Sequence, residues 1–105
     1  MVIVGFDIVA ALIIREKRRR ARQGRTLERR VAAWKQEVEQ ARWRDPAEVK
    51  AIFGRADVVG SNRIVFDVCG NNYRIVVQFN YAAGVARIRF AGTHAEYDKI
   101  DVRTI

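Results

Sequence analysis

Three strand-like segments lie in the stretch from Asn62 to Asp98, NRIVFDVCGNNYRIVVQFNYAAGVARIRFAGTHAEYD. Apolar and polar side chains alternate along them, which is typical of antiparallel strands with one face on a core. The apolar members are Ile64, Phe66, Val68, Ile75, Val77, Phe79, Ile88 and Phe90. The polar members are Arg63, Asp67, Arg74, Gln78, Asn80, Arg87 and Arg89. The stretch therefore predicts a meander of about three strands with one apolar and one arginine-rich face.

Two short turns separate these segments. Gly70-Asn71-Asn72 and Ala83-Gly84 lie between them, and Gly and Asn adopt the positive φ of tight turns at little steric cost. The last segment is followed by GTHAEYDK, Gly92 to Lys99, which places an imidazole and a phenol beside the arginine-rich face. That face is either an ordinary solvated surface or a functional site, and the alternation leaves both interpretations open.

Length and charge limit the classes of function. The chain has 105 residues, 50% of them hydrophobic, so we expect one domain spanning residues 1–105. A net charge of +8 favours a polyanionic partner, either nucleic acid or an acidic protein. Cys69 is the only cysteine and His94 the only histidine, which excludes an internal disulfide and a cysteine-based metal cluster. We expect no metal, no cofactor and a cytoplasmic location.

The opening segment MVIVGFDIVAALII, Met1 to Ile14, is almost wholly apolar and is followed at once by basic residues. A secretory signal carries its positive charges before the apolar run, and a membrane-spanning helix needs roughly 20 apolar residues. A peripheral anchor formed by residues 1–22 is the remaining membrane interpretation. We expect instead no stable membrane association, a strand at Val2 to Val4, and a helix from about Ile8 capped by Asp7.

Two long helices are predicted next. The first continues toward Gly24, a residue suited to ending a helix. The second follows a start signal at Thr26 and runs from about Leu27 to Arg42. Its apolar side chains recur at helical spacing and include Leu27, Val31, Trp34, Val38 and Ala41. Trp34 and Trp43 are predicted to lie in the core or at its rim; the alternative is stacking on a base, which requires an exposed ring.

A short helix from about Pro46 to Phe53 is predicted from Asp45 as its cap and Pro46 as its first residue. A loop from Gly54 to Ser61 then leads to the meander. The order strand, two long helices, short helix and three strands predicts an α+β fold. We expect the helices to cover one face of a small antiparallel sheet and to leave the arginine-rich face open.

Basic residues are concentrated between Arg15 and Arg30. Nine Lys or Arg stand there against Glu16 and Glu28, so most of the excess charge lies in one predicted helical hairpin. One interpretation is a solvated face. We favour a surface that contacts RNA phosphates, because such a like-charge cluster repels itself and a polyanion relieves the repulsion. The proposed contacts are Arg18, Arg19 and Arg20.

Four segments, AAWKQEV, ARWRDPAEVKAIF, NRIVFDVCGNNYRIVVQFNY and RIRFAGTHAEYDKI, resemble the HigB-type toxins of bacterial type II toxin-antitoxin pairs. The resemblance covers about Ala33 to Ile100, and GNNYR and THAEYDKI are its most specific part. It implies a RelE-like fold, cleavage of messenger RNA on the ribosome, and a HigA-like helix-turn-helix antitoxin as partner. Asp67 departs from the family, in which Asn is more usual at this position.

The resemblance implies four catalytic residues: Arg74 in GNNYR, Arg89 in RIRF, and His94 and Tyr97 in THAEYD. RNA is cut without a metal when its 2′-hydroxyl attacks the neighbouring phosphorus, which requires a proton acceptor, a proton donor and cations on the developing charge. The two guanidiniums suit the phosphate and His94 suits proton transfer. Tyr97 can orient the 2′-hydroxyl, stack on a base or transfer a proton. The acid and base roles stay open.

Further RNA contacts are expected from the same face and from the loop that follows it, namely Arg63, Arg87 and Lys99. The expected partners are messenger RNA on the ribosome, ribosomal RNA and the antitoxin. A different class of function also fits the basic surface, a non-catalytic module that binds RNA or the ribosome. That alternative predicts salt-sensitive association without a cleavage product. It does not explain why His94 and Tyr97 occur beside the arginines.

Overall fold

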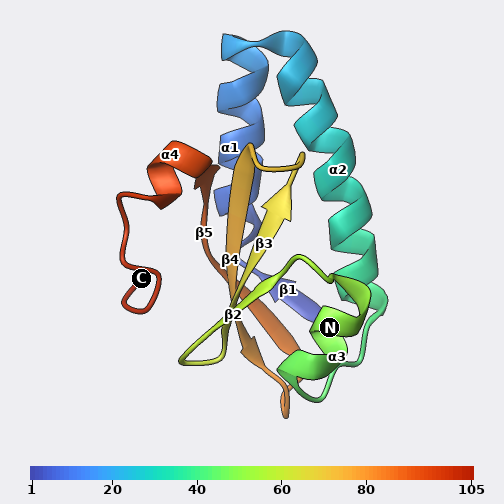
Figure 1. The fold of residues 1–105 in the computed structure, drawn as a ribbon. Helices are drawn as coiled ribbons and strands as arrows, with labels where there is room; N and C mark the ends of the chain where they lie inside the picture. The colour runs from blue at the N-terminus through green and yellow to red at the C-terminus, as the bar shows by residue number, and fades with distance from the viewer.

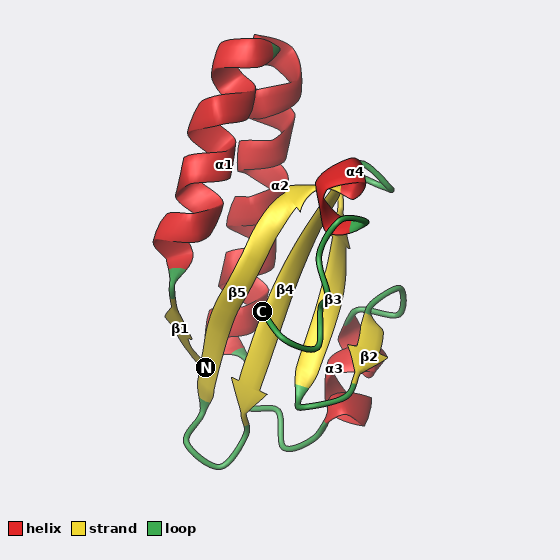
Figure 2. Ribbon diagram, turned by 90° about the vertical axis from the view of Figure 1, so that its left-hand side faces the viewer, coloured by secondary structure: helices red, strands yellow, loops and turns green.

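Five strands form one sheet in the order β1-β5-β4-β3-β2 (Figures 1 and 2). Their bounds are β1 Val2–Val4, β2 Asp57–Val59, β3 Arg63–Val68, β4 Tyr73–Asn80 and β5 Val85–Thr93. Neighbouring strands are antiparallel except β1 and β5, which are parallel. The computed structural model describes all residues from 1 to 105. The predicted strand at Val2 to Val4 and the predicted meander are both confirmed.

The helices are α1 Phe6–Arg19, α2 Ala21–Gln40, α3 Pro46–Ile52 and α4 His94–Tyr97. Helices α1 and α2 form an antiparallel hairpin against one face of the sheet, and its tip projects beyond the sheet (Figure 1). The start of α3 is as predicted, because Asp45 Oδ1 accepts from the Glu48 amide at 3.0 Å and Pro46 is the first helical residue. The predicted α+β fold class is confirmed.

The core lies between the hairpin and the sheet. Trp34 and Trp43 are 5% and 7% exposed, so both are core residues and neither ring is available to stack on a base. The indole of Trp34 packs edge-on against Phe66 at 5.5 Å between centroids, and Trp43 packs in the same way against Phe79 at 5.8 Å. None of the helices combines the length and the apolar character needed to cross a membrane.

The boundary between the two long helices differs from the prediction. The break falls at Arg20, whose backbone is extended, and Gly24 lies inside α2 rather than at the end of α1. A Cβ at Gly24 would lie 2.4 Å from the Lys17 amide nitrogen, so the glycine permits close approach of the two helices. The predicted cap at Asp7 is also wrong. Helix α1 begins after Gly5, which has a left-handed φ of 85°, and Asp7 lies in the first turn.

A β-bulge changes the register near the end of the sheet. Val77 pairs with Ile88 and Val76 pairs with Phe90, so Arg89 is an extra residue in β5. Because paired residues share a face, Phe90 lies on the side opposite to the helices, and its predicted place on the core face is wrong. The predicted loop from Gly54 to Ser61 also contains a strand, β2, which pairs with β3.

The second face of the sheet is only partly open, contrary to the prediction. Val65 and Val76 pair on this face and are 1% and 0% exposed. The chain after α4 passes in front of the sheet in Figure 2. Arg63 and Arg89 both donate to the carbonyl oxygen of Ile105, which ties this segment to the face. Arg87 and Arg89 remain exposed on this face, whereas its middle and Arg63 are covered.

Candidate active site

Three of the four predicted catalytic residues meet at the end of the sheet where β4 begins and β5 ends. Arg74 Nη2 lies 3.0 Å from His94 Nδ1, and the Arg74 guanidinium lies over the Tyr97 ring, 5.9 Å from its centroid. Arg74 is 8% exposed, whereas the His94 side chain is 47% exposed. We call Arg74, His94 and Tyr97, with Asp67 and Asn71 behind them, the site cluster.

All of the N–H groups of Arg74 have acceptors. Its Nε lies 3.2 Å from Asp67 Oδ1, and Nη1 donates to the carbonyl oxygens of Asn71 and Tyr73 at 3.2 Å and 3.1 Å. Its Nη2 donates to Asn71 Oδ1 and to His94. A guanidinium has five N–H donors; the four on Nη1 and Nη2 are hydrogen-bonded here, and Nε faces Asp67 in an ion pair. Arg74 is thus a fixed positive charge beneath the exposed imidazole.

The same contact sets the tautomer of His94. A guanidinium has no acceptor, so His94 Nδ1 must offer its lone pair to Arg74, and the proton of the neutral ring is then on Nε2. Nε2 lies 3.5 Å from Asp98 Oδ2. The ring therefore presents an N–H donor outward while its single lone pair is held by Arg74.

Tyr97 lies at the edge of the site cluster and stays protonated at neutral pH. Burial raises the pKa of its phenol, with the carboxylate of Asp57 adding to the shift and Arg74 opposing it. The ring also contacts Phe90, 6.4 Å away between centroids. Tyr97 is therefore a hydrogen-bond donor, and it is poorly suited to take up a proton as a base.

The backbone explains why these residues meet. Arg74 on β4 pairs with Gly92 on β5, which brings the residue after β5 beside the turn before β4. The His94 amide donates to the Asn72 carbonyl at 2.9 Å. A capping box then starts α4, because the Thr93 hydroxyl accepts from the Glu96 amide and the Glu96 carboxylate accepts from the Thr93 amide. His94 and Tyr97 are thus the first and last residues of one short helical turn.

A protein-family model, described as HigB_toxin, the RelE-like toxic component of a toxin-antitoxin system, matches residues 27–100. The chain belongs to the HigB toxin family. It is thus the toxin of a toxin-antitoxin system, and the family implies an antitoxin partner. No curated protein matches the chain. The family match spans the site cluster and leaves out α1, which ends at Arg19.

The other predicted residues of this HigB-family toxin lie apart from the site cluster. Arg89 is exposed at the bulge and its Nε donates to the Ile105 carbonyl at 3.2 Å. Arg63 is 7% exposed, and its guanidinium is held by the carbonyls of Ser61 and Ile105. Arg87 is exposed on β5 and pairs with Gln78, which on its other side pairs with Arg63. The structure does not bring these arginines to His94.

Lys99 is exposed and lies two residues after the end of α4. Arg18, Arg19 and Arg20 are exposed at the tip of the α1–α2 hairpin, and of these only Arg19 lies near an acid, 3.6 Å from Glu16. A small polar pocket lined by Arg19, Arg20, Asn72 and Thr93, among others, separates the hairpin from the turn behind His94. Lys99 and the hairpin therefore flank the site cluster and extend its positive surface.

Sequence reasoning missed part of the machinery of this HigB-family site. Asn71 was assigned to a turn, yet its side-chain and main-chain oxygens both bind Arg74. Asp67 was noted as a departure from the family, and it forms the ion pair with Arg74 and lies 3.8 Å from Arg55. Glu96 was not considered, although the spacing Thr93-x-x-Glu96 is a readable capping box.

Proposed function

We propose that this toxin is an endoribonuclease that cleaves messenger RNA on the ribosome. The observation that carries the proposal is the Arg74 to His94 contact of 3.0 Å with Tyr97 against the same guanidinium. A buried cation, an exposed imidazole and a neutral phenol lie within one helical turn and one strand end. These are the groups that metal-independent RNA cleavage requires.

In the proposed reaction the 2′-hydroxyl attacks the adjacent phosphorus and the bond to the 5′ oxygen breaks. The phosphate draws Arg74 Nη2 toward its oxygens, which releases His94 Nδ1 to take the 2′ proton. The Tyr97 phenol gives its proton to the departing 5′ oxygen. Arg74 stabilises the negative charge that develops on the phosphorane. The products carry a 2′,3′-cyclic phosphate and a free 5′-hydroxyl.

The exposed arginines of the hairpin support ribosomal RNA as the docking partner. Arg18, Arg20 and Arg22 are exposed and have no acidic partner within ion-pair distance, so their charge is available to phosphates. We propose that the messenger is held by three exposed basic residues outside the site cluster, namely Arg87, Arg89 and Lys99. We further propose that a helix-turn-helix antitoxin silences the toxin by covering this surface.

One observation favours a second candidate, a non-catalytic module that binds RNA. Arg74 is buried with four hydrogen-bonded donors and an ion pair to Asp67, which is also the pattern of an arginine that holds a turn in place. In that case the phosphate would be bound by Arg87, Arg89 and the hairpin alone. The two functions differ in one product, the cut messenger.

The deciding experiment is primer extension on messenger from purified translating ribosomes incubated with the toxin. The expected result is new 5′ ends with free hydroxyls, and none when naked messenger replaces ribosome-bound messenger. Expression without an antitoxin should stop growth, and co-expression of a helix-turn-helix gene encoded beside this one should restore it. Ribosome binding without cuts would establish the non-catalytic module instead.

A further inference from the structure

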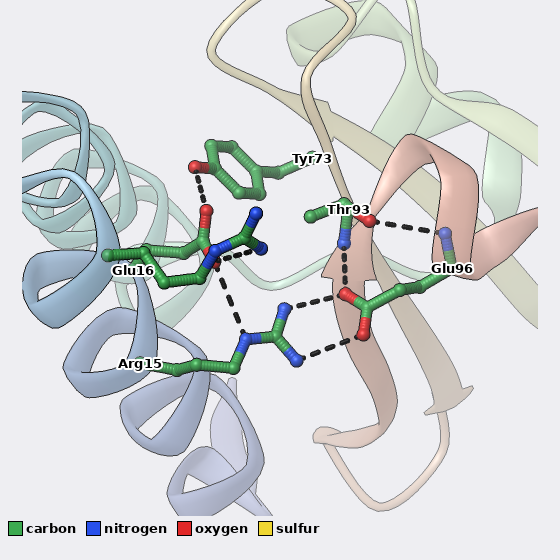
Figure 3. A network of polar contacts seen from close by, with 6 residues as sticks. Arg15, Glu16, Tyr73, Thr93 and Glu96 are labelled. Atoms are coloured by element: carbon green, nitrogen blue, oxygen red, sulfur yellow. Dashed lines mark hydrogen bonds and ion pairs between the residues drawn. The ribbon is translucent and has the colours of Figure 1, made fainter.

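An ion-pair network links α1 to the helix that carries His94 and Tyr97 (Figure 3). Arg15 donates from Nη1 and Nη2 to the two carboxylate oxygens of Glu96, at 2.9 Å and 2.6 Å. Glu96 is also the capping-box residue of α4. Arg15 Nε lies 3.4 Å from Glu16, which accepts a hydrogen bond of 2.6 Å from the Tyr73 hydroxyl. The network therefore reaches both strands of the site.

Helix α4 is too short to be stable alone. It spans four residues, and isolated helices shorter than about 12 residues are marginal in water. No residue of α4 is buried, so packing holds it only weakly. A bidentate Arg–carboxylate pair adds direction as well as energy, because two parallel N–H groups fix the carboxylate in one plane. The Arg15 contact is the tie that reaches α4 from the hairpin.

The second end of the network is rigid. Glu16 is 4% exposed and Tyr73 is 1% exposed, and their contact joins α1 to the first residue of β4. Burial raises the pKa of the Tyr73 phenol, and its hydrogen bond to Glu16 raises it further. Tyr73 immediately precedes Arg74. Arg15 thus contacts the buried carboxylate of Glu16 through Nε and binds Glu96 of α4 through Nη1 and Nη2.

We propose that Arg15 is a positioning residue that fixes α4, and with it His94 and Tyr97, relative to Arg74. The inference rests on the proposed cleavage reaction for its kinetic consequence only. Arg15 lies in α1, outside residues 27–100, which match the family model. A catalytic group displaced by about 1 Å can lose roughly 100-fold in rate.

The test uses three variants: Arg15→Gln, Glu96→Gln, and the double variant that carries both changes. Lys35→Gln is the control. Lys35 pairs with Glu39 and lies over the Phe6 ring at the start of α1, so its variant loses one positive charge, one ion pair and one cation–π contact away from the site. We expect Arg15→Gln and Glu96→Gln each to lower kcat by up to about 5-fold with KM little changed, because an exposed ion pair of at most about 1 kcal/mol can shift the population of correctly placed α4 by no more than that. The double variant should be no slower than Arg15→Gln. Lys35→Gln should cleave like the wild type.

Glu96→Gln separates positioning from charge. It makes the protein more positive, so an effect through RNA attraction alone would speed cleavage, whereas loss of positioning slows it. Arg15→Lys should recover only part of the rate, because an ammonium cannot make the paired contact. Wild-type kcat in Arg15→Gln, or independent losses in the double variant, would overturn the proposal.

Amide hydrogen exchange decides the inference even where the wild type fails to cleave. In the isolated protein, the amides of Glu96, Asp98 and Lys99 donate within α4 and its cap, and they report its opening. We expect them to exchange faster in Arg15→Gln than in Lys35→Gln. Equal exchange in the two variants would show that Arg15 does not hold α4. Absent cleavage by the wild type would count against the proposed function alone.

Discussion

At the tip of the α1–α2 hairpin, Arg18, Arg20 and Arg22 are exposed and have no acidic partner. In the site cluster, Arg74 is 8% exposed and each of its donors has an acceptor. The first arrangement leaves charge free to attract a polyanion at long range and is screened by salt. The second holds one charge beside the site by short-range contacts, so that in the proposed reaction only Nη2 has to shift, from His94 to a phosphate oxygen.

The comparison shows that a count of arginines does not locate a reaction centre. The hairpin holds more positive charge than the site cluster, yet it offers no group that transfers a proton near neutral pH. The site cluster has a single arginine, and it combines that arginine with an imidazole and a phenol. We therefore propose that the hairpin binds the ribosome and that the site cluster carries the chemistry, and each proposal has its own test.

The largest effect is expected from the site cluster. His94→Ala should lower cleavage of ribosome-bound messenger by about 10²- to 10⁴-fold, the usual cost of losing a general acid or base. Tyr97→Phe should have a similar effect, because it removes the phenolic proton and keeps the ring. The melting temperature should change little for His94→Ala, whose side chain is 47% exposed. The measurement is single-turnover primer extension with a ribosome-binding assay alongside.

Ribosome affinity is the control for this prediction. If binding is a property of the hairpin, His94→Ala and Tyr97→Phe should bind ribosomes as the wild type does. Wild-type cleavage by both variants would mean that the site cluster is misassigned. Loss of ribosome binding by either variant would mean that the site cluster also contributes to binding, contrary to the proposed division of roles.

The next largest effect tests whether the hairpin is a rigid arm. Gly24→Ala places a methyl group 2.4 Å from the Lys17 backbone, which cannot move without separating the helices. Despite the better helix propensity of Ala, we expect a loss of about 1–3 kcal/mol in the free energy of unfolding. Gly54→Ala is the matched control, because a Cβ there meets nothing within 4 Å. Urea denaturation should separate the two, and equal stability would show that the helices are loosely packed.

A smaller effect concerns salt. Arg18→Gln with Arg20→Gln should lower the slope of log affinity against log salt for ribosome binding by about 1 to 2 units. The control pair, Arg42→Gln with Lys50→Gln, removes the same charge from exposed positions at the opposite end of the helical layer. Its slope should stay near the wild-type value. Equal slopes in both pairs would mean that net charge, rather than the hairpin, governs docking.

Local signals in the sequence predicted much of the fold. Asp45 and Pro46 marked the start of α3 because capping and a fixed φ depend on neighbouring residues alone. The alternation in β3 and β4 gave the core face correctly, since no bulge interrupts that pair. Gly24 was misread because ending a helix and admitting a neighbouring helix both favour glycine. Only its contact with Lys17 distinguishes the two uses.

The site was predictable where adjacent strands bring it together. Arg74 and His94 follow from the β4–β5 pairing, because the two strand ends meet at one edge. Phe90 was misplaced since the alternation continues through the bulge at Arg89, and only the register shows the change of face. Arg15 was grouped with the basic cluster because its partner Glu96 lies 81 residues away in sequence.

The smallest expected effect is a pH dependence of stability that arises from the Arg15–Glu96 ion pair. The Arg15 guanidinium holds the pKa of Glu96 at about 2, below its ordinary value of 4.5, with the Thr93 amide adding to the effect. A carboxylate with a lowered pKa in the folded state stabilises the fold above pH 4.5, and this contribution is lost as the pH falls toward 2. The side chains of Arg15 and Glu96 are 43% and 41% exposed, so solvent screening limits the gain to under about 1 kcal/mol.

The melting temperatures of the wild type and Glu96→Gln should differ most above pH 5 and converge near pH 2. Glu39→Gln removes a similarly exposed ion pair from α2 and controls for the lost charge. A difference between wild type and Glu96→Gln that stays constant with pH would show that Arg15 does not hold Glu96 in its ionised form.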